Sequence, residues 1–188
     1  MTERKAPRVT IPRHTKPRPE STQVRKDSMT PAETSAEIER LHAAGFAWSM
    51  ACCGRDRERA EDVLQASYLK ILDGRARFAG RSSFKTFLFG VIRRTAAEER
   101  RKTAIGRVIF GIALRAEPSV GEGASVDRLA FQTALARLAR RQREVLELVF
   151  SMGMTVQEAA DTLSISAGSA RVHYDRGKKR LAALLGRR

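Results

Sequence analysis

The sequence predicts an all-α protein made of two small helical domains joined by a flexible linker, with a helix-turn-helix in the C-terminal domain. Apolar residues recur at three- and four-residue steps in two blocks, residues 33–102 and 127–188, which is the period of an amphipathic helix. Residues 103–126 contain four glycines and one proline and show no sustained period, as expected of a linker. Aromatic residues make up only 6% of the chain, so the cores are expected to be mostly aliphatic.

Residues 1–32 are predicted to form a disordered basic tail. Five of the six prolines of the chain lie there, among scattered lysines and arginines. The tail holds too few apolar residues to offset the entropy that ordering it would cost.

Three amphipathic helices are predicted in residues 33–102. The first begins at Thr34 and places five residues on one face: Ile38, Leu41, Gly45, Trp48 and Cys52. The second ends at Asp73-Gly74 and has an apolar face of Leu64, Tyr68, Ile71 and Leu72. The third has the strongest period of the chain and ends in a charged run at residues 98–102, with a face of Phe84, Phe87, Leu88, Val91, Ile92 and Thr95.

A helix-turn-helix is predicted over residues 155–185. Thr155 and Glu158 have the spacing of a capping box, which starts a short helix that a turn at residues 164–166 ends. On the longer helix that follows, one face is expected to be buried: Ala170, Tyr174, Gly177, Leu181 and Leu184. The opposite face and its flanks carry the candidate DNA-reading residues Ser169, Arg171, Val172, His173, Arg176 and Lys179.

The charge of the chain favours a polyanionic partner. Lys and Arg number 36 against 21 Asp and Glu, a formal net charge of +15, which is typical of proteins that bind nucleic acid or an anionic membrane surface. No run of about 18 apolar residues is present, so we expect no membrane insertion. The N-terminus lacks the apolar segment of a secretory signal, and a cytoplasmic location is expected.

The sequence gives no sign of an enzyme. We find no nucleophile with a neighbouring base, no metal-ligand cluster and no phosphate-binding loop, so neither a cofactor nor a metal is expected. Cys52 and Cys53 are adjacent and lack the spacing of a zinc site, which favours two reduced, partly buried thiols on a helix.

Two sets of residues match the motifs of one family. In the C-terminal block they are Gln142–Leu146, Thr155–Ala160, Ser166–Arg171 and Arg176–Leu181; in the N-terminal block they include Ala60–Gln65, Tyr68-Leu69, Phe87-Leu88 and Arg101-Lys102. Through these motifs the chain resembles the extracytoplasmic-function (ECF) sigma factors of bacterial RNA polymerase. The resemblance covers about 150 residues in the family's order.

The resemblance implies a role for each block. Residues 33–102 would bind core RNA polymerase through Asp62 and Gln65 on the outward face of the second helix. The same block would recognise and melt the minus-ten promoter element, with Phe78, Arg81, Phe84, Phe87, Arg93, Arg94 and Arg101 as candidates. Residues 127–188 would recognise the minus-thirty-five element. A core position for Phe84 competes with a role in DNA binding, and an anti-sigma factor is a further partner that the resemblance leaves open.

A second reading of the sequence is a stand-alone helix-turn-helix transcription regulator. Such a protein would need neither the Asp62 and Gln65 surface nor the aromatic and basic third helix. Binding to core RNA polymerase separates the two readings.

Overall fold

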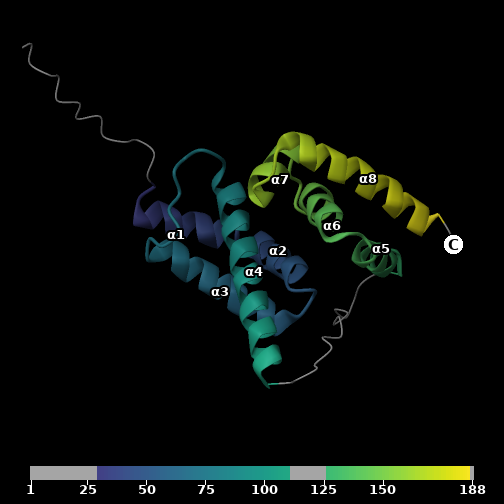
Figure 1. The fold of residues 1–188 in the computed structure, drawn as a ribbon. Coiled ribbons are helices and arrows are strands. Elements are labelled where there is room, and N and C mark those ends of the chain that lie inside the picture. The colour runs from purple at the N-terminus through teal and green to yellow at the C-terminus, as the bar shows by residue number, and fades with distance from the viewer. Residues whose placement is uncertain (1–28, 111–125, 187–188) are drawn as a thin grey trace, which may run out of the picture.

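A long central helix, α4, lies between two groups of helices in the structure (Figure 1). The computed structural model describes residues 29–110 and 126–186, and within these ranges every regular element is helical. The N-terminal half consists of α1 (Pro31–Arg40), α2 (His42–Cys52), α3 (Arg57–Leu72) and α4 (Phe84–Phe110), with α2 passing behind α4 in this view. The C-terminal half consists of α5 (Val126–Ala136), α6 (Arg140–Leu146), the π-helical turn η1 (Glu147–Ser151), α7 (Val156–Leu163) and α8 (Ala167–Leu185).

Trp48 of α2 joins the helices of the N-terminal half. Its side chain is almost fully buried, its ring stacks on that of Phe89, and its indole N–H donates to the Phe89 carbonyl oxygen at 3.0 Å. The next residue, Ser49, donates its hydroxyl to the carbonyl oxygen of Ala60 at 2.8 Å. Because a buried polar group without a partner is costly, these two bonds fix how α2 sits on α3 and α4.

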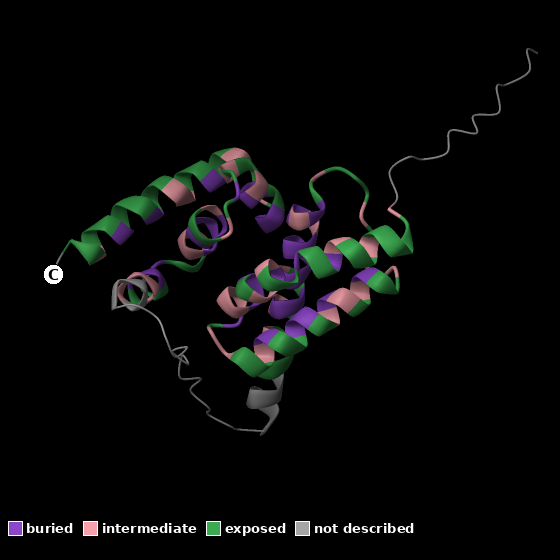
Figure 2. Ribbon diagram, turned by 180° about the vertical axis from the view of Figure 1, so that it is seen from behind, coloured by how far each residue is buried: buried purple, intermediate pink, exposed green. Residues whose placement is uncertain are grey.

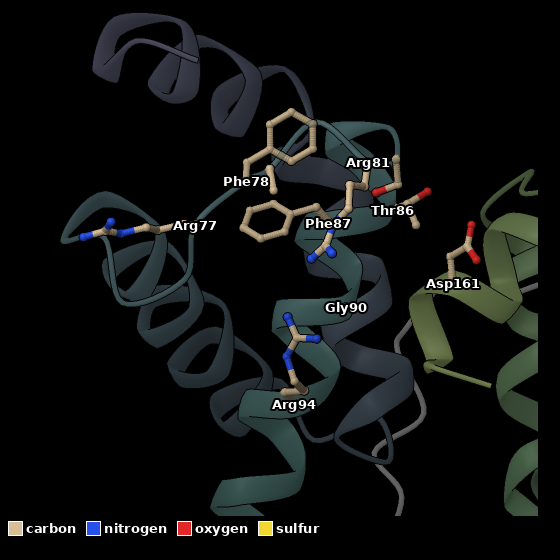
Figure 3. Close-up of a pocket in the computed structure, with 10 residues that line it drawn as sticks. Arg77, Phe78, Arg81, Thr86, Phe87, Gly90, Arg94 and Asp161 are labelled. Carbon is tan, nitrogen blue, oxygen red and sulfur yellow. The ribbon is translucent and has the colours of Figure 1, made fainter. Parts of the chain in front are cut away.

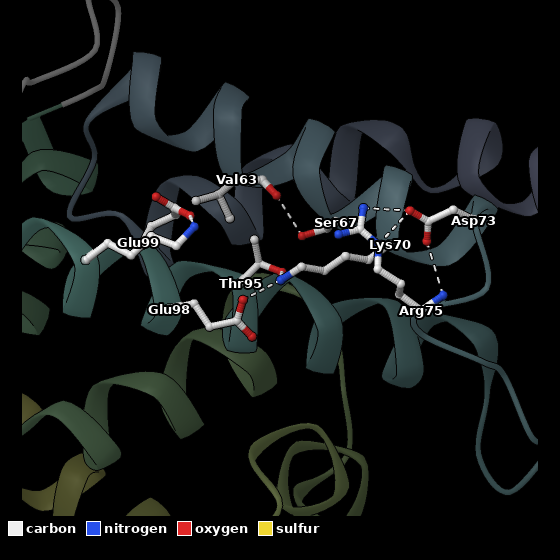
Figure 4. Close-up of polar contacts among 9 residues, drawn as sticks. Val63, Ser67, Lys70, Asp73, Arg75, Thr95, Glu98 and Glu99 are labelled. Carbon is white, nitrogen blue, oxygen red and sulfur yellow. Dashed lines mark hydrogen bonds and ion pairs between the residues drawn. The ribbon is translucent and has the colours of Figure 1, made fainter.

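A second connection joins α3 to α4 at the surface. The Lys70 ammonium group donates to the Thr95 hydroxyl at 3.0 Å and to the Glu98 carboxylate, as Figure 4 shows. Lys70 therefore holds the carboxylate of Glu98 against the outside of the N-terminal half.

The C-terminal half is built on the close approach of α8 to α6. A Cβ atom placed on Gly177 would lie 3.1 Å from Gln142 Cβ and 3.1 Å from Leu146 Cδ1, so a side chain there would force α6 to shift slightly away from α8. Leu181 of α8 is buried in the same small core, together with Leu135 and Leu138. Each of these helices has a buried face and an exposed face, as expected of amphipathic helices (Figure 2).

The structure corrects two boundaries of the sequence prediction. The first predicted helix is two helices, α1 and α2, which meet at a bend at the buried Leu41. The third helix continues to Phe110 and does not end near residue 102, so the linker prediction is wrong over residues 103–110. A single internal glycine, Gly106, costs a helix only about 1 kcal/mol, which is too little to end it.

The expectations for the tail, the linker, the apolar face of the second helix and the two cysteines have mixed outcomes. Residues 30–32 begin α1, with a capping box between Thr30 and Glu33, and do not belong to a tail. Residues 1–28 and 111–125, which hold most of the predicted tail and linker, lie outside the described residues. Leu72 is exposed and not part of the apolar face of its helix. The two free thiols are as expected, with Cys52 partly buried and Cys53 buried.

The glycine contacts lead to a prediction for stability. Gly168, near the start of α8, has open space around it, whereas Gly177 faces α6. Gly168→Ala should raise the free energy of unfolding by up to about 1 kcal/mol through helix propensity. Gly177→Ala gains the same propensity but overpacks the α6–α8 contact, so it should be less stable than Gly168→Ala by roughly 1–3 kcal/mol. Urea denaturation measures both values, and equal stabilities would contradict the close approach.

Candidate nucleic-acid interface

The helix-turn-helix forms as its sequence predicts. Glu158 accepts from both the backbone N–H and the hydroxyl of Thr155, and these hydrogen bonds lower the pKa of its carboxyl group. Ser164 ends α7 in the left-handed conformation with φ 54°, and Ser166 caps α8 through its hydroxyl. The turn thus sets the direction of α8, whose N-terminal residues follow directly after the cap at Ser166.

The exposed face of α8 carries the predicted DNA-reading residues. Ala170, Gly177 and Leu181 are buried, as the helical period predicted. Val172 is 46% exposed and lies among the polar residues of this face. The other predicted residues on this face are also exposed, apart from the half-buried His173: Ser169, Arg171, Arg176 and Lys179.

A second surface is an aromatic pocket at the N-terminal end of α4 (Figure 3). The rings of Phe78 and Phe87 lie 5.4 Å apart, and the hollow beside them has a volume of about 270 Å³. Three cationic side chains line it: Arg77, Arg81 and Arg94. Phe84 is only 7% exposed and packs behind both other rings, so it supports the pocket from the core.

Two of the predicted minus-ten residues lie outside this pocket. Arg93 points away from the pocket toward α6, where it is 3.5 Å from the Glu144 carboxylate. Burial lowers the pKa of Arg93, and the cationic Arg141 and Arg140 lower it further while Glu144 opposes them. Arg101 lines a separate hollow together with Arg93 and with Arg94, which borders both.

The exposed face of α3 extends beyond the two residues that the sequence singled out. Asp62 and Gln65 are exposed, and Leu69 and Leu72 follow on the same face with exposed fractions of 59% and 55%. Sequence reasoning missed these leucines as surface residues. Their spacing of four and seven residues from Gln65 was the available signal, because that step places them on the polar face.

The two halves of the chain pack directly on each other through α7 and α4. Val145, Leu148, Ala159 and Leu163 belong to the same buried core as the N-terminal helices. A Cβ atom on Gly90 of α4 would lie 3.6 Å from the Thr162 carbonyl oxygen of α7, so the helices approach closely here.

Polar contacts reinforce this packing. Arg55 donates to the buried Glu147 carboxylate at 2.9 Å, and the Lys85 ammonium group donates to the Met152 carbonyl oxygen. Asp161 of α7 lines the aromatic pocket of α4 (Figure 3). The arrangement therefore sets the C-terminal half beside the pocket that the N-terminal half provides.

Comparison with known proteins decides the family. The sigma-70 region 2 family matches residues 39–105, and the sigma-70 region 4 family matches residues 128–181. The ECF RNA polymerase sigma factor SigX of Bacillus subtilis is 31% identical over 135 residues, which cover 66% of this chain and 70% of SigX. This chain belongs to the ECF sigma factor family.

Other relatives agree with this assignment. The ECF sigma factor EcfG of Rhodopseudomonas palustris is 27% identical over 132 residues, covering 68% of this chain and 72% of EcfG. Among solved structures, the sigma factor RpoE of Bartonella quintana, in complex with the anti-sigma factor NepR, superposes with a TM-score of 0.69. That match has 23% identity and covers 81% of this chain and 96% of RpoE, so it shows the shared fold.

As a member of this family, the present chain directs transcription initiation by RNA polymerase and binds the core enzyme and promoter DNA. It is a sigma factor and not an enzyme. The presence of region 2 rules out the stand-alone regulator that the sequence left open. Within the described residues, no helix combines the length and the apolar character needed to cross a bilayer.

The buried Glu144 carboxylate generates a prediction for the packing of the two halves. It faces Arg93 of α4 and also pairs with Arg140 and Arg141. Glu144→Ala should weaken the packing by roughly 1–3 kcal/mol, because the largely buried Arg93 of α4 loses its counter-ion on α6. The radius of gyration from small-angle X-ray scattering should increase while the far-ultraviolet circular dichroism stays helical. The matched variant Glu99→Ala removes an exposed carboxylate from α4 and should leave the radius unchanged; an unchanged radius in Glu144→Ala would contradict the role of this carboxylate.

Proposed function

We propose that this ECF sigma factor divides promoter recognition and polymerase binding among three surfaces. The exposed face of α8 reads the minus-thirty-five element, the aromatic pocket of α4 holds an unstacked base of the minus-ten element, and the outward face of α3 binds core RNA polymerase. We assign polymerase binding and the minus-ten element to residues 33–102, and the minus-thirty-five element to residues 127–188. The observation that carries the proposal is the exposed, partly basic face of α8, which no other part of the described chain covers.

The shape and chemistry of α8 support its place in the major groove. In a helix-turn-helix the N-terminal half of the second helix enters this groove, and arginine there can donate two hydrogen bonds to a guanine. Arg171 and Arg176 are both exposed, and Val172 between them offers an apolar contact suited to a thymine methyl group. The later part of α8 carries three more basic residues, where DNA backbone phosphates would run beside the helix: Lys178, Lys179 and Arg180.

The aromatic pocket supports recognition of a single-stranded base. A base taken out of its stack binds well between aromatic faces, while arginines hold the phosphates beside it. Phe78 and Phe87 supply the faces, and Arg81 and Arg94 supply the charge at the rim of the same hollow. Arg93 joins the promoter surface only when α6 moves away, because it is engaged with Glu144, whereas Arg101 is already exposed.

The outward face of α3 supports docking to the polymerase. Two large exposed leucines next to Asp62 and Gln65 form a mixed apolar and polar patch, which is typical of a protein-binding surface. We place the contact partner at the clamp helices of the largest subunit of the polymerase, as the family resemblance implies. The protein acts in the cytoplasm, where core polymerase and DNA are present.

The packing of α7 on α4 supports a further element of the proposal. Asp161 places a carboxylate at the pocket that would receive DNA, and a carboxylate repels the phosphate backbone. The two halves must separate before the pocket and α8 bind one promoter. An anti-sigma factor that holds the halves together would inhibit the protein, and RpoE of Bartonella quintana was solved in complex with an anti-sigma factor, NepR.

Arg176 tests the reading of the minus-thirty-five element. If it pairs with a guanine, Arg176→Ala should weaken promoter binding by the holoenzyme by roughly 1–3 kcal/mol and relax preference at one base pair. Lys179→Ala serves as the matched variant, because a phosphate contact should weaken binding evenly and lower the salt slope by about one unit. Binding to a set of single-base promoter variants measures both effects. Promoter affinity, base preference and salt slope all unchanged in Arg176→Ala would exclude this helix from the groove.

Asp62 tests the polymerase contact. Asp62→Arg reverses an exposed charge on α3 and should weaken the complex with core RNA polymerase at least tenfold without unfolding the protein. Glu39→Arg makes the same charge change on α1 and should bind as the wild type does. Fluorescence anisotropy with labelled sigma factor measures the dissociation constants. The contact is misplaced if both variants bind core enzyme equally well.

A further inference from the structure

A second hollow lies further along α4 toward its C-terminal end, between α4 and α6, and shares Arg94 with the aromatic pocket. Its volume is about 710 Å³, and its walls carry six arginines. Helix α4 supplies Arg93, Arg94, Arg100 and Arg101, and α6 supplies Arg140 and Arg141. The remaining lining residues are Ala97, Glu98 and Ala104.

Few negative charges oppose these arginines. The Glu98 carboxylate is bound by Lys70 of α3 (Figure 4), so its charge is already shared. Glu144 lies behind the wall and serves three guanidinium groups at once, at 3.5 Å from Arg93, 2.9 Å from Arg140 and 3.0 Å from Arg141. Within the described residues no carboxylate pairs with Arg94, Arg100 or Arg101. The hollow therefore carries a strong excess of positive charge.

Two buried nitrogen atoms also make no hydrogen bond, although Arg93 Nε lies 3.5 Å from the Glu144 carboxylate. The second atom is Arg100 Nη2, whose neighbour Arg100 Nη1 donates to the Cys52 carbonyl oxygen at 2.7 Å. Burial lowers the pKa of Arg100, and the nearby positive charge of Arg140 lowers it further. Buried donors without acceptors are rare in folded proteins, and they often indicate a ligand or water that completes the site.

We infer that this hollow binds a chain of phosphate groups and takes it up when the two halves are packed together. Planar guanidinium groups form paired hydrogen bonds with phosphate oxygens, and arginines on two facing helices suit an extended anion better than a single phosphate. Among the described residues that line the hollow there is no aromatic ring to stack on a base. The apolar residues in this described lining are Ala97 and Ala104, which give the side chains of an acidic peptide little to bind.

Binding at this site has a consequence for the conformation of the protein. Because α4 and α6 each supply part of the walls, the complete site exists only in the packed arrangement. A ligand that binds one of two conformations shifts the population toward that conformation. A phosphate chain would therefore hold the aromatic pocket and α8 in the arrangement that must open for promoter binding.

Inorganic tripolyphosphate is a suitable probe, with the full chain studied by isothermal titration calorimetry at low salt. The double variant Arg140→Gln/Arg141→Gln removes the α6 wall, and its affinity should fall at least tenfold. The matched variant Arg137→Gln/Arg143→Gln removes two arginines from the same segment that do not line the hollow, and its affinity should change less than twofold. An equal loss in both variants means unspecific charge attraction and overturns the site, as does full affinity in the first variant.

A second measurement distinguishes phosphate chains from nucleic acid. Saturating tripolyphosphate should keep or reduce the radius of gyration measured by small-angle X-ray scattering, whereas a short oligothymidylate of the same charge should bind at least tenfold more weakly to the wild type. Tighter oligothymidylate binding that depends on Arg140 and Arg141 would assign the hollow to a DNA strand and overturn the proposal. Expansion of the chain by tripolyphosphate would overturn it too. Since neither α6 arginine belongs to the three promoter and polymerase surfaces, failure here is separable from failure of Arg176→Ala.

Discussion

The burial of α4 from two sides is the constraint on which the rest of the structure depends. One face carries Leu88 and Ile92 into the core of the N-terminal half, where Trp48 holds the helix through the Phe89 carbonyl oxygen. Another face, at Gly90, receives α7 of the C-terminal half. The exposed residues of α4 begin at Arg94 and continue toward its C-terminal end, and Arg94 borders both arginine-lined hollows. A helix so enclosed can offer its reading side chains only where neither half covers it.

Local signals in the sequence were sufficient to find the helix-turn-helix. The Thr155 and Glu158 pair, the cap at Ser166 and the helical period of the last helix each depend on residues within a few positions of one another. The extent of α4 was harder, because Gly106 resembles a breaker while the flanking residues favour a helix. The aromatic pocket was predicted in part: Phe78, Phe87, Arg81 and Arg94 come together as expected, and Phe84 turned inward.

The contacts between the halves could not be predicted in this way. Arg93 and Glu144 are 51 positions apart, and nothing near either residue in the sequence identifies the other as its partner. The same holds for Arg55 with Glu147, which are 92 positions apart. An arginine that faces DNA and an arginine that faces a distant carboxylate can have the same neighbours in the sequence. The sequence around them therefore does not tell the two apart. The family resemblance assigned roles to positions, but only the three-dimensional arrangement showed which arginines of α4 face α6.

The position of α7 beside the aromatic pocket has a thermodynamic consequence for selectivity. When a binding site is accessible in only a fraction of molecules, its apparent dissociation constant rises by the inverse of that fraction. If the aromatic pocket binds DNA as proposed, the segment that supplies Asp161 acts as an intramolecular competitor, present at a concentration that dilution cannot lower. A polymerase that holds the two halves apart would remove this competitor from both proposed DNA-binding surfaces at once. Free sigma factor would then occupy promoters poorly even though the exposed side chains of α8 are already in place.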